Sequence, residues 1–375
     1  MKILIVRLYP YELKIDGYNV QEIGLAKALT NKGHQCDIVL YTSSNERVQE
    51  IKTDGGLIKI FWIKGINFLK NGMYGNKIIN LAKQYDIIQS SEYDQLYNLK
   101  LNRKLKSKLI IYHGPYYSKF NKRYNLKCRI FDTLFLTKKY KNTKFITKSE
   151  LATEFLKEKG IKNVKTIGVG LNDEMIKKEN KNKILNELNE NIKYLLYIGK
   201  LEERRNIIFL LNILKKIIAK KENVKLVIVG KGDKQYIDKI FEYIEKEHLE
   251  SNIIYKECIG QDEVNLLYKR CKVFLLPSSY EIFGMVLLEA MYCGIPVITT
   301  NNGGSSTLIK NKKNGYIYSL DKIDEWTETI MTLLDNEDIS EKIIKNAKKT
   351  IKDKFLWKNI VDNFIECYQE KLKEN

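Results

Sequence analysis

The chain has 375 residues, of which 44% are hydrophobic and 30% are charged, and its formal net charge is +19. This composition is typical of a globular protein with a sizeable core, and the length suits roughly two domains of about 150 residues each. The composition excludes a membrane-crossing helix, because no stretch reaches the ~18 consecutive apolar residues that such a helix needs.

Six cysteines are present without a C-x-x-C pair, and the three histidines are scattered along the chain. We expect free thiols in a reducing, cytoplasmic compartment and no metal site. The positive charge could serve nucleic acid, an anionic membrane or an anionic substrate. Much of it is lysine beside asparagine and isoleucine, a mixture that AT-rich coding also produces. Its distribution is therefore more informative than its total.

In the first half, short apolar runs alternate with a helical pattern. We expect strands at residues 2–6, 36–40, 58–62, 87–90 and 108–112. Residues 19–32 carry apolar side chains at helical spacing, and Gly33 follows them as a C-cap. Strands that alternate with helices predict βαβ units around a parallel sheet.

The same pattern starts again in the second half. We expect strands at residues 193–198, 225–229, 252–256, 273–276 and 296–299, and helices at 206–221, 234–248, 261–271 and 284–293. Residues 172–192 are rich in Lys, Asn and Glu and predict a connection. The predicted organisation is an N-terminal domain at 1–171, a connection at 172–192, a C-terminal domain at 193–352 and a final amphipathic helix at 353–375 that packs back on the N-terminal domain.

The clearest site signal is the segment 273–300, VFLLPSSYEIFGMVLLEAMYCGIPVITT. It predicts a buried strand, a polar loop with Glu281, and a helix that opens at Gly284 and carries Glu289. Free N–H groups at such a helix start can hold a diphosphate, and Gly284 lets a ligand approach the backbone closely. The two carboxylates could accept hydrogen bonds from sugar hydroxyls. An E-x7-E pair alone is weak evidence, because most glutamates are simply solvated.

In its context, P-S-S-x-E-x-F-G-x-x-x-x-E-A-M-x-x-G-x-P-V-I, the pair closely resembles the signature of retaining glycosyltransferases of family 4. That family has the GT-B fold, so the resemblance implies α/β architecture with two Rossmann-like doubly wound domains facing each other across a cleft. We expect Glu281 to contact the transferred sugar. The resemblance implies that Glu289 holds the donor's ribose. The expected donor-binding loop is Ile282, Phe283, Gly284 and Met285.

Residues 198–206, IGKLEERRN, resemble the family's G-R-L-x-x-x-K-G segment, whose two basic residues hold the donor diphosphate. Lys200 and Arg205 occupy the two basic positions with their identities exchanged, so charge is kept while geometry differs. Asn206 replaces a glycine, and Gly199 lies on the expected donor side. Gly230 belongs to a G-x-G turn that resembles the family's, although an ordinary strand-to-helix turn explains it equally well.

Two positions in the first half complete the resemblance. The loop 10–17 follows the first strand, where the family has a Gly-Gly loop, and only Gly17 remains of that pair. His113 ends the fifth strand, where the family commonly has a histidine beside the reacting sugar. A purely structural histidine at a strand end is the alternative. Residues 301–309 resemble the family's N-G-G-x-x-E-x-I loop, but Thr307 replaces the glutamate, and we assign it no specific role.

The expected activity is transfer of a sugar from a nucleotide-diphosphate donor to a saccharide or lipid-linked acceptor, in cell-surface glycan biosynthesis. The resemblance implies retention of anomeric configuration and no required metal, with Lys200, Arg205 and the helix start stabilising the leaving diphosphate. Glu281 and His113 complete the catalytic candidates. A nucleotide-sugar epimerase of the same fold would need a fuller set of acid and base groups. A non-catalytic glycan- or lipid-binding relative would not need both glutamates.

The stretch 100–148 holds fifteen Lys or Arg residues and a single acidic residue, Asp132, with aromatic residues interleaved. Solvated lysines around core aromatics would explain it. The sharper interpretation is a surface that docks on the anionic inner leaflet of the plasma membrane, since basic residues attract anionic lipid and aromatic residues suit the interfacial layer. No nucleic-acid recognition motif accompanies the charge, so we expect no nucleic-acid partner.

Overall fold

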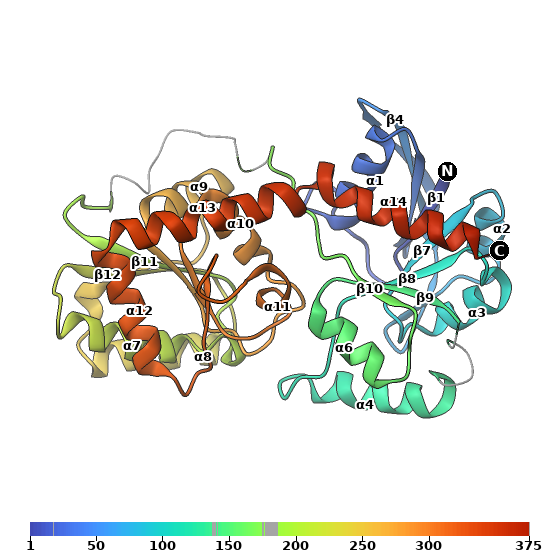
Figure 1. Ribbon diagram of the computed structural model, residues 1–375. Coiled ribbons are helices and arrows are strands. Elements are labelled where there is room, and N and C mark those ends of the chain that lie inside the picture. The colour runs from blue at the N-terminus through green and yellow to red at the C-terminus, as the bar shows by residue number, and fades with distance from the viewer. Residues whose placement is uncertain (18, 137–139, 141, 175, 177–186, 375) are drawn as a thin grey trace. The chain divides into compact units, whose positions relative to one another are not determined.

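The computed structural model describes residues 1–17, 19–136, 140, 142–174, 176 and 187–374 (Figure 1). The chain divides into two compact units: Met1–Asn172 with Phe355–Asn375, and Asp173–Lys354. Of the predicted connection at 172–192, residues 175 and 177–186 lie outside the described residues. We call the two units the N-terminal and the C-terminal unit.

The N-terminal unit is built on an eight-stranded sheet in the order β10-β9-β8-β7-β1-β2-β4-β3. Its strands are β1 (Lys2–Val6), β2 (Gln35–Thr42), β3 (Arg47–Thr53), β4 (Gly56–Lys64), β7 (Ile87–Ser91), β8 (Leu109–His113), β9 (Lys144–Thr147) and β10 (Val164–Thr166). All neighbours pair in parallel except β3, which is antiparallel to β4. A small hairpin, β5 (Ile66–Phe68) and β6 (Asn71–Met73), stands apart from this sheet.

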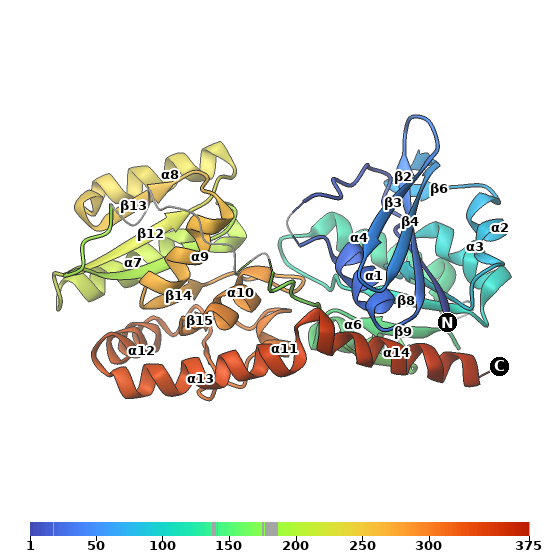
Figure 2. The same ribbon diagram turned by 90° about the horizontal axis from the view of Figure 1, so that it is seen from above.

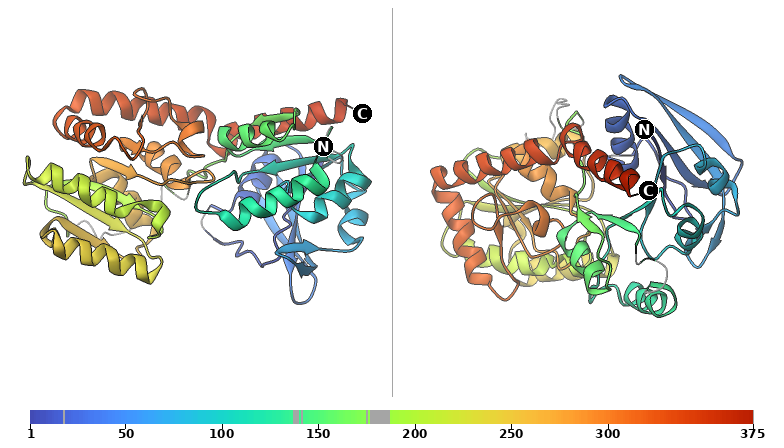
Figure 3. Two further views of the ribbon diagram at one scale, coloured as in Figure 1. Left: turned by 90° about the horizontal axis from the view of Figure 1, so that it is seen from below. Right: turned by 45° about the vertical axis from the view of Figure 1, so that its right-hand side comes forward.

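The helices of this unit are α1 (Gln21–Asn31), α2 (Lys77–Ala82), α3 (Leu96–Leu105), α4 (Lys122–Phe131), the π-helical η1 (Asp132–Leu136), α6 (Glu150–Glu158) and α14 (Trp357–Lys373). Figure 3 shows α4 at the periphery of the unit. The central strands β1, β7 and β8 are short and are buried almost throughout, as strands covered on both faces must be.

The predicted final helix at 353–374 is interrupted, which corrects the sequence interpretation. Helix α13 runs to Lys354 and α14 begins at Trp357. Between them the chain pairs with Leu171, whose N–H donates to the Phe355 carbonyl at 2.8 Å. The Trp357 indole then occupies space that glycines leave open, since a Cβ on Gly24 would lie 2.1 Å from Trp357 Nε1 and one on Gly170 2.2 Å from its Cδ2. Backbone pairing and this close packing therefore end one helix and start the next.

The C-terminal unit is a six-stranded parallel sheet in the order β13-β12-β11-β14-β15-β16. Its strands are β11 (Lys193–Ile198), β12 (Val224–Val229), β13 (Ile253–Lys256), β14 (Val273–Leu276), β15 (Val297–Thr299) and β16 (Tyr316–Ile317). Its longer helices are α7 (Ile207–Ile218), α8 (Lys234–Lys246), α9 (Gln261–Arg270), α10 (Met285–Cys293), α12 (Ile323–Asp335) and α13 (Glu337–Lys354). Helices α9, α10 and α13 cover one face and α7, α8 and α12 the other (Figures 1 and 2).

Both sheets follow the doubly wound order, in which the first strand lies centrally and the chain builds outward in each direction. The order reverses between β1 and β7 in the N-terminal unit and between β11 and β14 in the C-terminal unit. Ligands of such sheets bind outside the carboxyl ends of the strands at these switch points. All ten predicted strands are present, and the predicted pair of Rossmann-like sheets is confirmed.

Several shorter features complete the description. All six cysteines are free thiols; Cys36, Cys128, Cys271 and Cys367 are buried, whereas Cys258 is exposed. Among the helices of the described residues, none is both long enough and apolar enough to cross a membrane.

Candidate functional site

The loops that follow β11 and β14 meet at the switch point of the C-terminal unit. Asn206 adopts a left-handed conformation (φ 52°, ψ 47°), which asparagine tolerates better than most residues. Its side-chain amide donates to the Pro277 carbonyl at 2.7 Å and to Ser279 Oγ at 2.8 Å. The Ser279 N–H donates to the Arg204 carbonyl at 2.9 Å. Asn206 can therefore replace the family's glycine, and it also fastens the two loops together.

This fastening brings Arg205 and Glu281 into contact. Glu281 is 7% exposed, and its Oε1 forms an ion pair with Arg205 Nη1 and lies 3.7 Å from Arg204 Nη1. Arg205 Nη1 also donates to Ser278 Oγ at 3.1 Å. Burial lowers the pKa of the Arg205 guanidinium, which is the cost of holding a cation away from water. Glu281, the predicted sugar-binding carboxylate, and Arg205, one of the predicted diphosphate-binding cations, thus lie side by side in one partly buried site.

Arg204 is a site residue that the sequence interpretation passed over. Its Nη1 donates to the Tyr280 carbonyl, and its Nη2 lies 2.5 Å from Glu202 Oε1. The guanidinium therefore holds the backbone beside Glu281. The signal in the sequence was the adjacent pair Arg204–Arg205, of which only the second matched the family pattern.

The start of α10 is shaped by three glycines. Gly284 precedes the helix in a left-handed conformation (φ 74°, ψ 70°), and no side chain caps the first turn. The Gly303 N–H donates to the Glu281 carbonyl at 3.0 Å. A Cβ on Gly303 would lie 2.3 Å from the Ile282 carbonyl oxygen, and one on Gly304 would lie 1.8 Å from that of Phe283. Only glycines allow this contact, so the loop after β15 supports the segment that carries Glu281.

Asn302 holds that supporting loop in place. It is fully buried, and its Oδ1 accepts hydrogen bonds from the Gly304 and Ser305 N–H groups at 3.0 and 3.1 Å. The segment to which the sequence analysis gave no specific role is therefore structural support for the site. The N-N-G-G run was the feature of the sequence that could have indicated this supporting role.

The other residues predicted to bind the donor differ from one another in their exposure. Glu289 is buried in α10, where Tyr268 Oη donates to its Oε2 at 3.4 Å. Lys200 follows β11 with an exposed side chain. Ile282 is 38% exposed, Phe283 is buried and Met285 is partly buried.

The two predicted glycines of this unit lie where adjacent loops approach closely. A Cβ on Gly230 would lie 1.8 Å from the Gly199 carbonyl oxygen, and Gly230 has a φ of 153°. A Cβ on Gly199 would lie 3.0 Å from Tyr197 Oη. The close packing of Gly230 on Gly199 therefore explains the glycine at position 230 without a bound ligand.

His113, the predicted histidine of the N-terminal unit, is the last residue of β8 and is fully buried. Its Nδ1 lies 2.8 Å from Glu92 Oε2. The ring stacks on Phe155 with centroids 5.6 Å apart and is nearly perpendicular to the Tyr93 ring, with centroids 5.1 Å apart. The imidazole is thus held on one edge by a carboxylate and packed against two aromatic rings.

Glu92 is the second residue that sequence reasoning missed. Its carboxylate lies 3.0 Å from Lys148 Nζ and accepts the Gly114 N–H at 2.9 Å. Its own backbone has a φ of 50°, and its carbonyl accepts Asn98 Nδ2 at 2.6 Å. Positive φ at a residue other than glycine is uncommon and persists where the surroundings impose it. The signal was a polar run, Ser90 to Glu92, at the end of the buried strand β7.

The charges around Glu92 set its ionisation. Burial by itself raises the pKa of the Glu92 carboxyl, but Lys148 and His113 outweigh burial, so the net pKa lies well below the usual range. Glu92 is therefore a carboxylate at neutral pH, enclosed by groups that require its negative charge.

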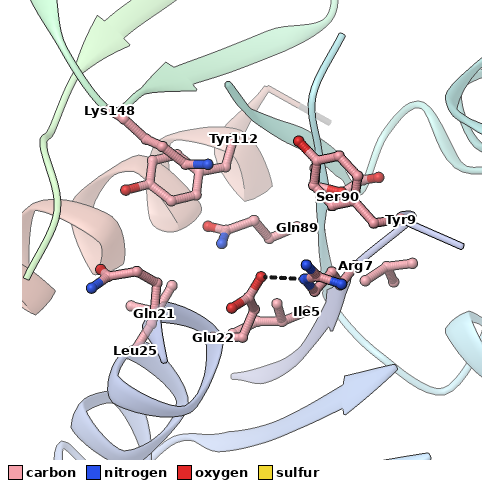
Figure 4. A pocket seen from close by; sticks show the side chains of 12 residues that line it. Ile5, Arg7, Tyr9, Gln21, Glu22, Leu25, Gln89, Ser90, Tyr112 and Lys148 are labelled. Atoms are coloured by element: carbon pink, nitrogen blue, oxygen red, sulfur yellow. Dashed lines mark ion pairs between the residues drawn. The ribbon is translucent and has the colours of Figure 1, made fainter. Parts of the chain in front are cut away.

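A pocket of about 50 Å³ lies at the switch point of the N-terminal sheet (Figure 4). Arg7 and Tyr9 line it from the end of β1, and Lys148 lies over the Tyr112 ring at 5.2 Å from its centroid. Arg7 Nε pairs with Glu22 Oε1 at 3.2 Å. Lys148 belongs both to this pocket and to the Glu92 cluster, so the pocket and His113 share one charged network.

Gly17, which we expected near phosphates or acceptor, lies in the loop before α1. It is exposed, and its N–H donates to the Lys14 carbonyl at 3.1 Å in a turn of that loop. The pocket at the switch point is lined by Arg7 and Tyr9 among others. Among the described residues, no three His, Cys, Asp or Glu side chains are grouped as metal ligands.

Comparisons with known proteins agree with this architecture. Residues 177–350 match the model of the family described as glycosyl transferases group 1. An uncharacterized glycosyltransferase of Methanocaldococcus jannaschii is 32% identical over 178 residues, which cover 47% of this chain and 45% of that protein. The chain thus spans about half the length of such curated relatives.

Solved structures of other proteins also resemble the whole chain. Sucrose-phosphate synthase from Thermosynechococcus elongatus has a TM-score of 0.76 at 16% identity, with 100% of both chains covered. HepE of Anabaena in complex with UDP has a TM-score of 0.70 at 15% identity, covering 99% of this chain and 100% of that one. At such identities the likeness concerns the fold, and it confirms the predicted GT-B fold class.

Proposed function

We propose that this protein is a glycosyltransferase that moves a sugar from a nucleotide-diphosphate donor to a saccharide or lipid-linked acceptor, with retention of anomeric configuration. The observation that carries the proposal is the ion pair between Arg205 and Glu281 at the switch point, beside the uncapped start of α10. A cation beside the N–H groups of a helix start suits a diphosphate, and a fixed carboxylate suits sugar hydroxyls. The group 1 family match over residues 177–350 supports the same class of activity.

In the proposed reaction the bond between the anomeric carbon and the diphosphate oxygen breaks. A bond to the acceptor oxygen forms on the same face, and the acceptor proton passes to the leaving phosphate. Arg205, Lys200 and the N–H groups of α10 offset the charge that develops on the diphosphate, in the place of a metal ion. Glu281 orients the sugar, and Glu289 holds the ribose.

His113 is proposed to contact the sugar or the acceptor from the N-terminal unit; because its ring is fully buried in the described structure, this contact requires a rearrangement that exposes the ring. Glu92 acts through it as a positioning residue, because it holds the Nδ1 edge of the ring. The acceptor class we propose is a glycan of cell-surface biosynthesis, free or lipid-linked, and the pocket beside Lys148 is its candidate site.

The test is a panel of nucleotide sugars, beginning with UDP-sugars because the solved relative HepE binds UDP. A true donor should raise the melting temperature, since a ligand that binds only the folded state stabilises it. The same donor should then label a glycan acceptor, detected by mass spectrometry. Glu281→Ala should abolish labelling, whereas Glu242→Ala, an exposed change on α8, should not. Donor breakdown or epimerisation without transfer to any acceptor would contradict the proposal.

A further inference from the structure

Helix α4 and the following η1 form a two-faced rod on the N-terminal unit. One face is core: Cys128 and Phe131 are buried, and Tyr124 and Phe135 are partly buried. Phe131 packs against Tyr93 and Tyr140, which are both fully buried. This face explains why the segment is helical, because its buried side chains recur every three or four residues.

The opposite side of the rod is also apolar, although it faces solvent. Leu126, Ile130 and Leu134 are 60%, 53% and 61% exposed, and Phe120 in the preceding loop is 50% exposed. The spacing i, i+4, i+8 places the first three along one face. Five of the thirteen exposed large hydrophobic side chains in the described structure lie between residues 117 and 134. An exposed apolar patch of this kind marks an interaction site.

Exposed cations flank these apolar side chains. We define the α4 surface as Lys119, Phe120, Lys122, Arg123, Leu126, Arg129, Ile130 and Leu134, all of which are exposed. Lys122, Arg123 and Arg129 are three or four positions from Leu126, so they border the apolar row. The nearest acidic residue in sequence, Asp132, already pairs with Lys159 and accepts from Tyr93 Oη at 3.1 Å. The cations of this surface therefore meet no local negative charge along the helix.

Several other basic residues of the stretch 100–148 are buried or already paired, so their charge is not available to an external partner. Lys144 is buried, with its Nζ 2.6 Å from Glu370. Lys127 pairs with Asp94 at 2.7 Å, and Lys148 pairs with Glu92. Lys108 donates to the Tyr85 carbonyl at 2.7 Å. Residues 138, 139 and 141 lie outside the described residues. The charge that remains on α4 is concentrated beside the exposed apolar row.

We propose that the α4 surface docks on an anionic lipid bilayer, with the apolar row entering the interfacial layer and the four cations contacting lipid headgroups. We choose an anionic bilayer over other occupants on the ground of charge complementarity. Lipid headgroups supply the negative charge that these cations lack, whereas a second copy of this basic chain would add positive charge. Each cation near such a membrane increases partitioning about fivefold. The inference rests on the proposed function in one respect: α4 follows the strand that ends at His113, so docking would bring the acceptor side of this unit to lipid-linked substrates.

The test is flotation of the full chain with phosphatidylcholine vesicles that contain increasing fractions of phosphatidylglycerol, at low and high salt. We expect binding that rises with phosphatidylglycerol and falls with salt. Leu126→Asn/Ile130→Asn/Leu134→Asn and Lys122→Glu/Arg123→Glu/Arg129→Glu should each reduce binding more than tenfold. The matched controls are Ile66→Asn/Phe68→Asn, and Lys27→Glu/Lys52→Glu/Lys83→Glu, which makes the same change in net charge at exposed sites of this unit.

Equal losses in the variants and their controls would overturn the proposal, as would binding that ignores lipid charge, or self-association through α4 in light scattering. All variants should keep the donor-induced rise in melting temperature, which shows that they fold. Docking without any sugar transfer would refute the proposed function and leave the α4 surface standing. Transfer to a soluble acceptor without flotation would do the reverse.

Discussion

His113 Nδ1 lies 2.8 Å from Glu92 Oε2 in the buried part of the N-terminal unit, although His113 is the last residue of β8 and Glu92 follows β7. Parallel pairing of β7 with β8 brings the ends of these strands together. The same carboxylate lies 3.0 Å from Lys148, which lines the pocket at the switch point. One acidic side chain thus links the predicted histidine to a candidate acceptor site.

Replacing Glu92 by glutamine should lower kcat by about tenfold or more while leaving the KM for the donor nearly unchanged. The carboxylate orients His113 and neutralises Lys148, but in our proposal it does not contact the donor. Initial rates over a range of donor concentrations give both constants. Glu154→Gln, at an exposed position of α6, is the control. A rise in donor KM with constant kcat would contradict a positioning role.

Glu92 should also make the protein sensitive to acid. Burial raises the pKa of its carboxyl, but Lys148 and His113 reverse that effect, so the folded pKa is depressed. Its contribution to stability is therefore complete above the ordinary glutamate pKa of about 4.3 and is lost as pH falls from there toward the folded value. Urea unfolding should show wild type and Glu92→Gln converging across this acidic window. A constant gap between them at all pH values would argue against this linkage.

Removing Arg205 alone should be worse for folding than removing Arg205 and Glu281 together. The single change removes the cation that lies nearest to the buried Glu281 carboxylate and leaves the more distant Arg204 Nη1 at 3.7 Å, a loss on the order of 2 kcal/mol. The double variant removes the carboxylate together with its nearest cation. Thermal or urea unfolding of both single variants and the double variant measures the coupling, and additive losses would show that the pair is not coupled.

Turnover should fall at least about 10²-fold in Glu281→Ala.

Glu289→Gln should weaken binding of both the nucleoside diphosphate and the intact donor, because we assign Glu289 to the ribose that they share. Titration calorimetry with each ligand measures this directly. The carboxylate also accepts the Tyr268 hydroxyl at 3.4 Å, so Tyr268→Phe is the informative companion. Product affinity that is unchanged in Glu289→Gln would remove this residue from the donor site.

Sugar transfer should continue in excess chelator, since we assign charge stabilisation to Arg205, Lys200 and the start of α10. The Lys200→Ala/Arg205→Ala variant should lose most donor binding in the same assay and still unfold cooperatively. If chelation stops transfer and added Mg²⁺ or Mn²⁺ restores it, the metal-free mechanism is wrong.

The central strands and the segment around Glu281 could be predicted because their information is local. Buried strands such as β1 and β11 are short apolar runs, and the Glu281 loop lies between one such strand and a helix with a recognisable start. The edge strands β3 and β10 carry few buried residues, so no local pattern distinguished them from loops. The contact between Glu92 and His113 was equally hidden, because it exists only after β7 and β8 have paired.

The basic stretch shows a different limit. A count of charges treats buried and exposed basic residues alike. Lys144 is buried and pairs with Glu370 from the far end of the chain, whereas Arg129 is exposed. Composition cannot separate these two positions, because the separation depends on which helix covers β9. Only the resolved packing separates the buried or paired lysines of this stretch from the exposed cations that border Leu126 and Ile130.

The Trp357 indole, held between Gly24 and Gly170, has a consequence for biosynthesis. The N-terminal unit takes its last helix, α14, from the end of the chain, whereas the C-terminal unit is continuous. Domains fold as they leave the ribosome, so the second unit is complete in sequence before the first can close around its tryptophan. During translation the surface of α1 that receives α14 therefore remains uncovered until residues 357–373 have left the ribosome.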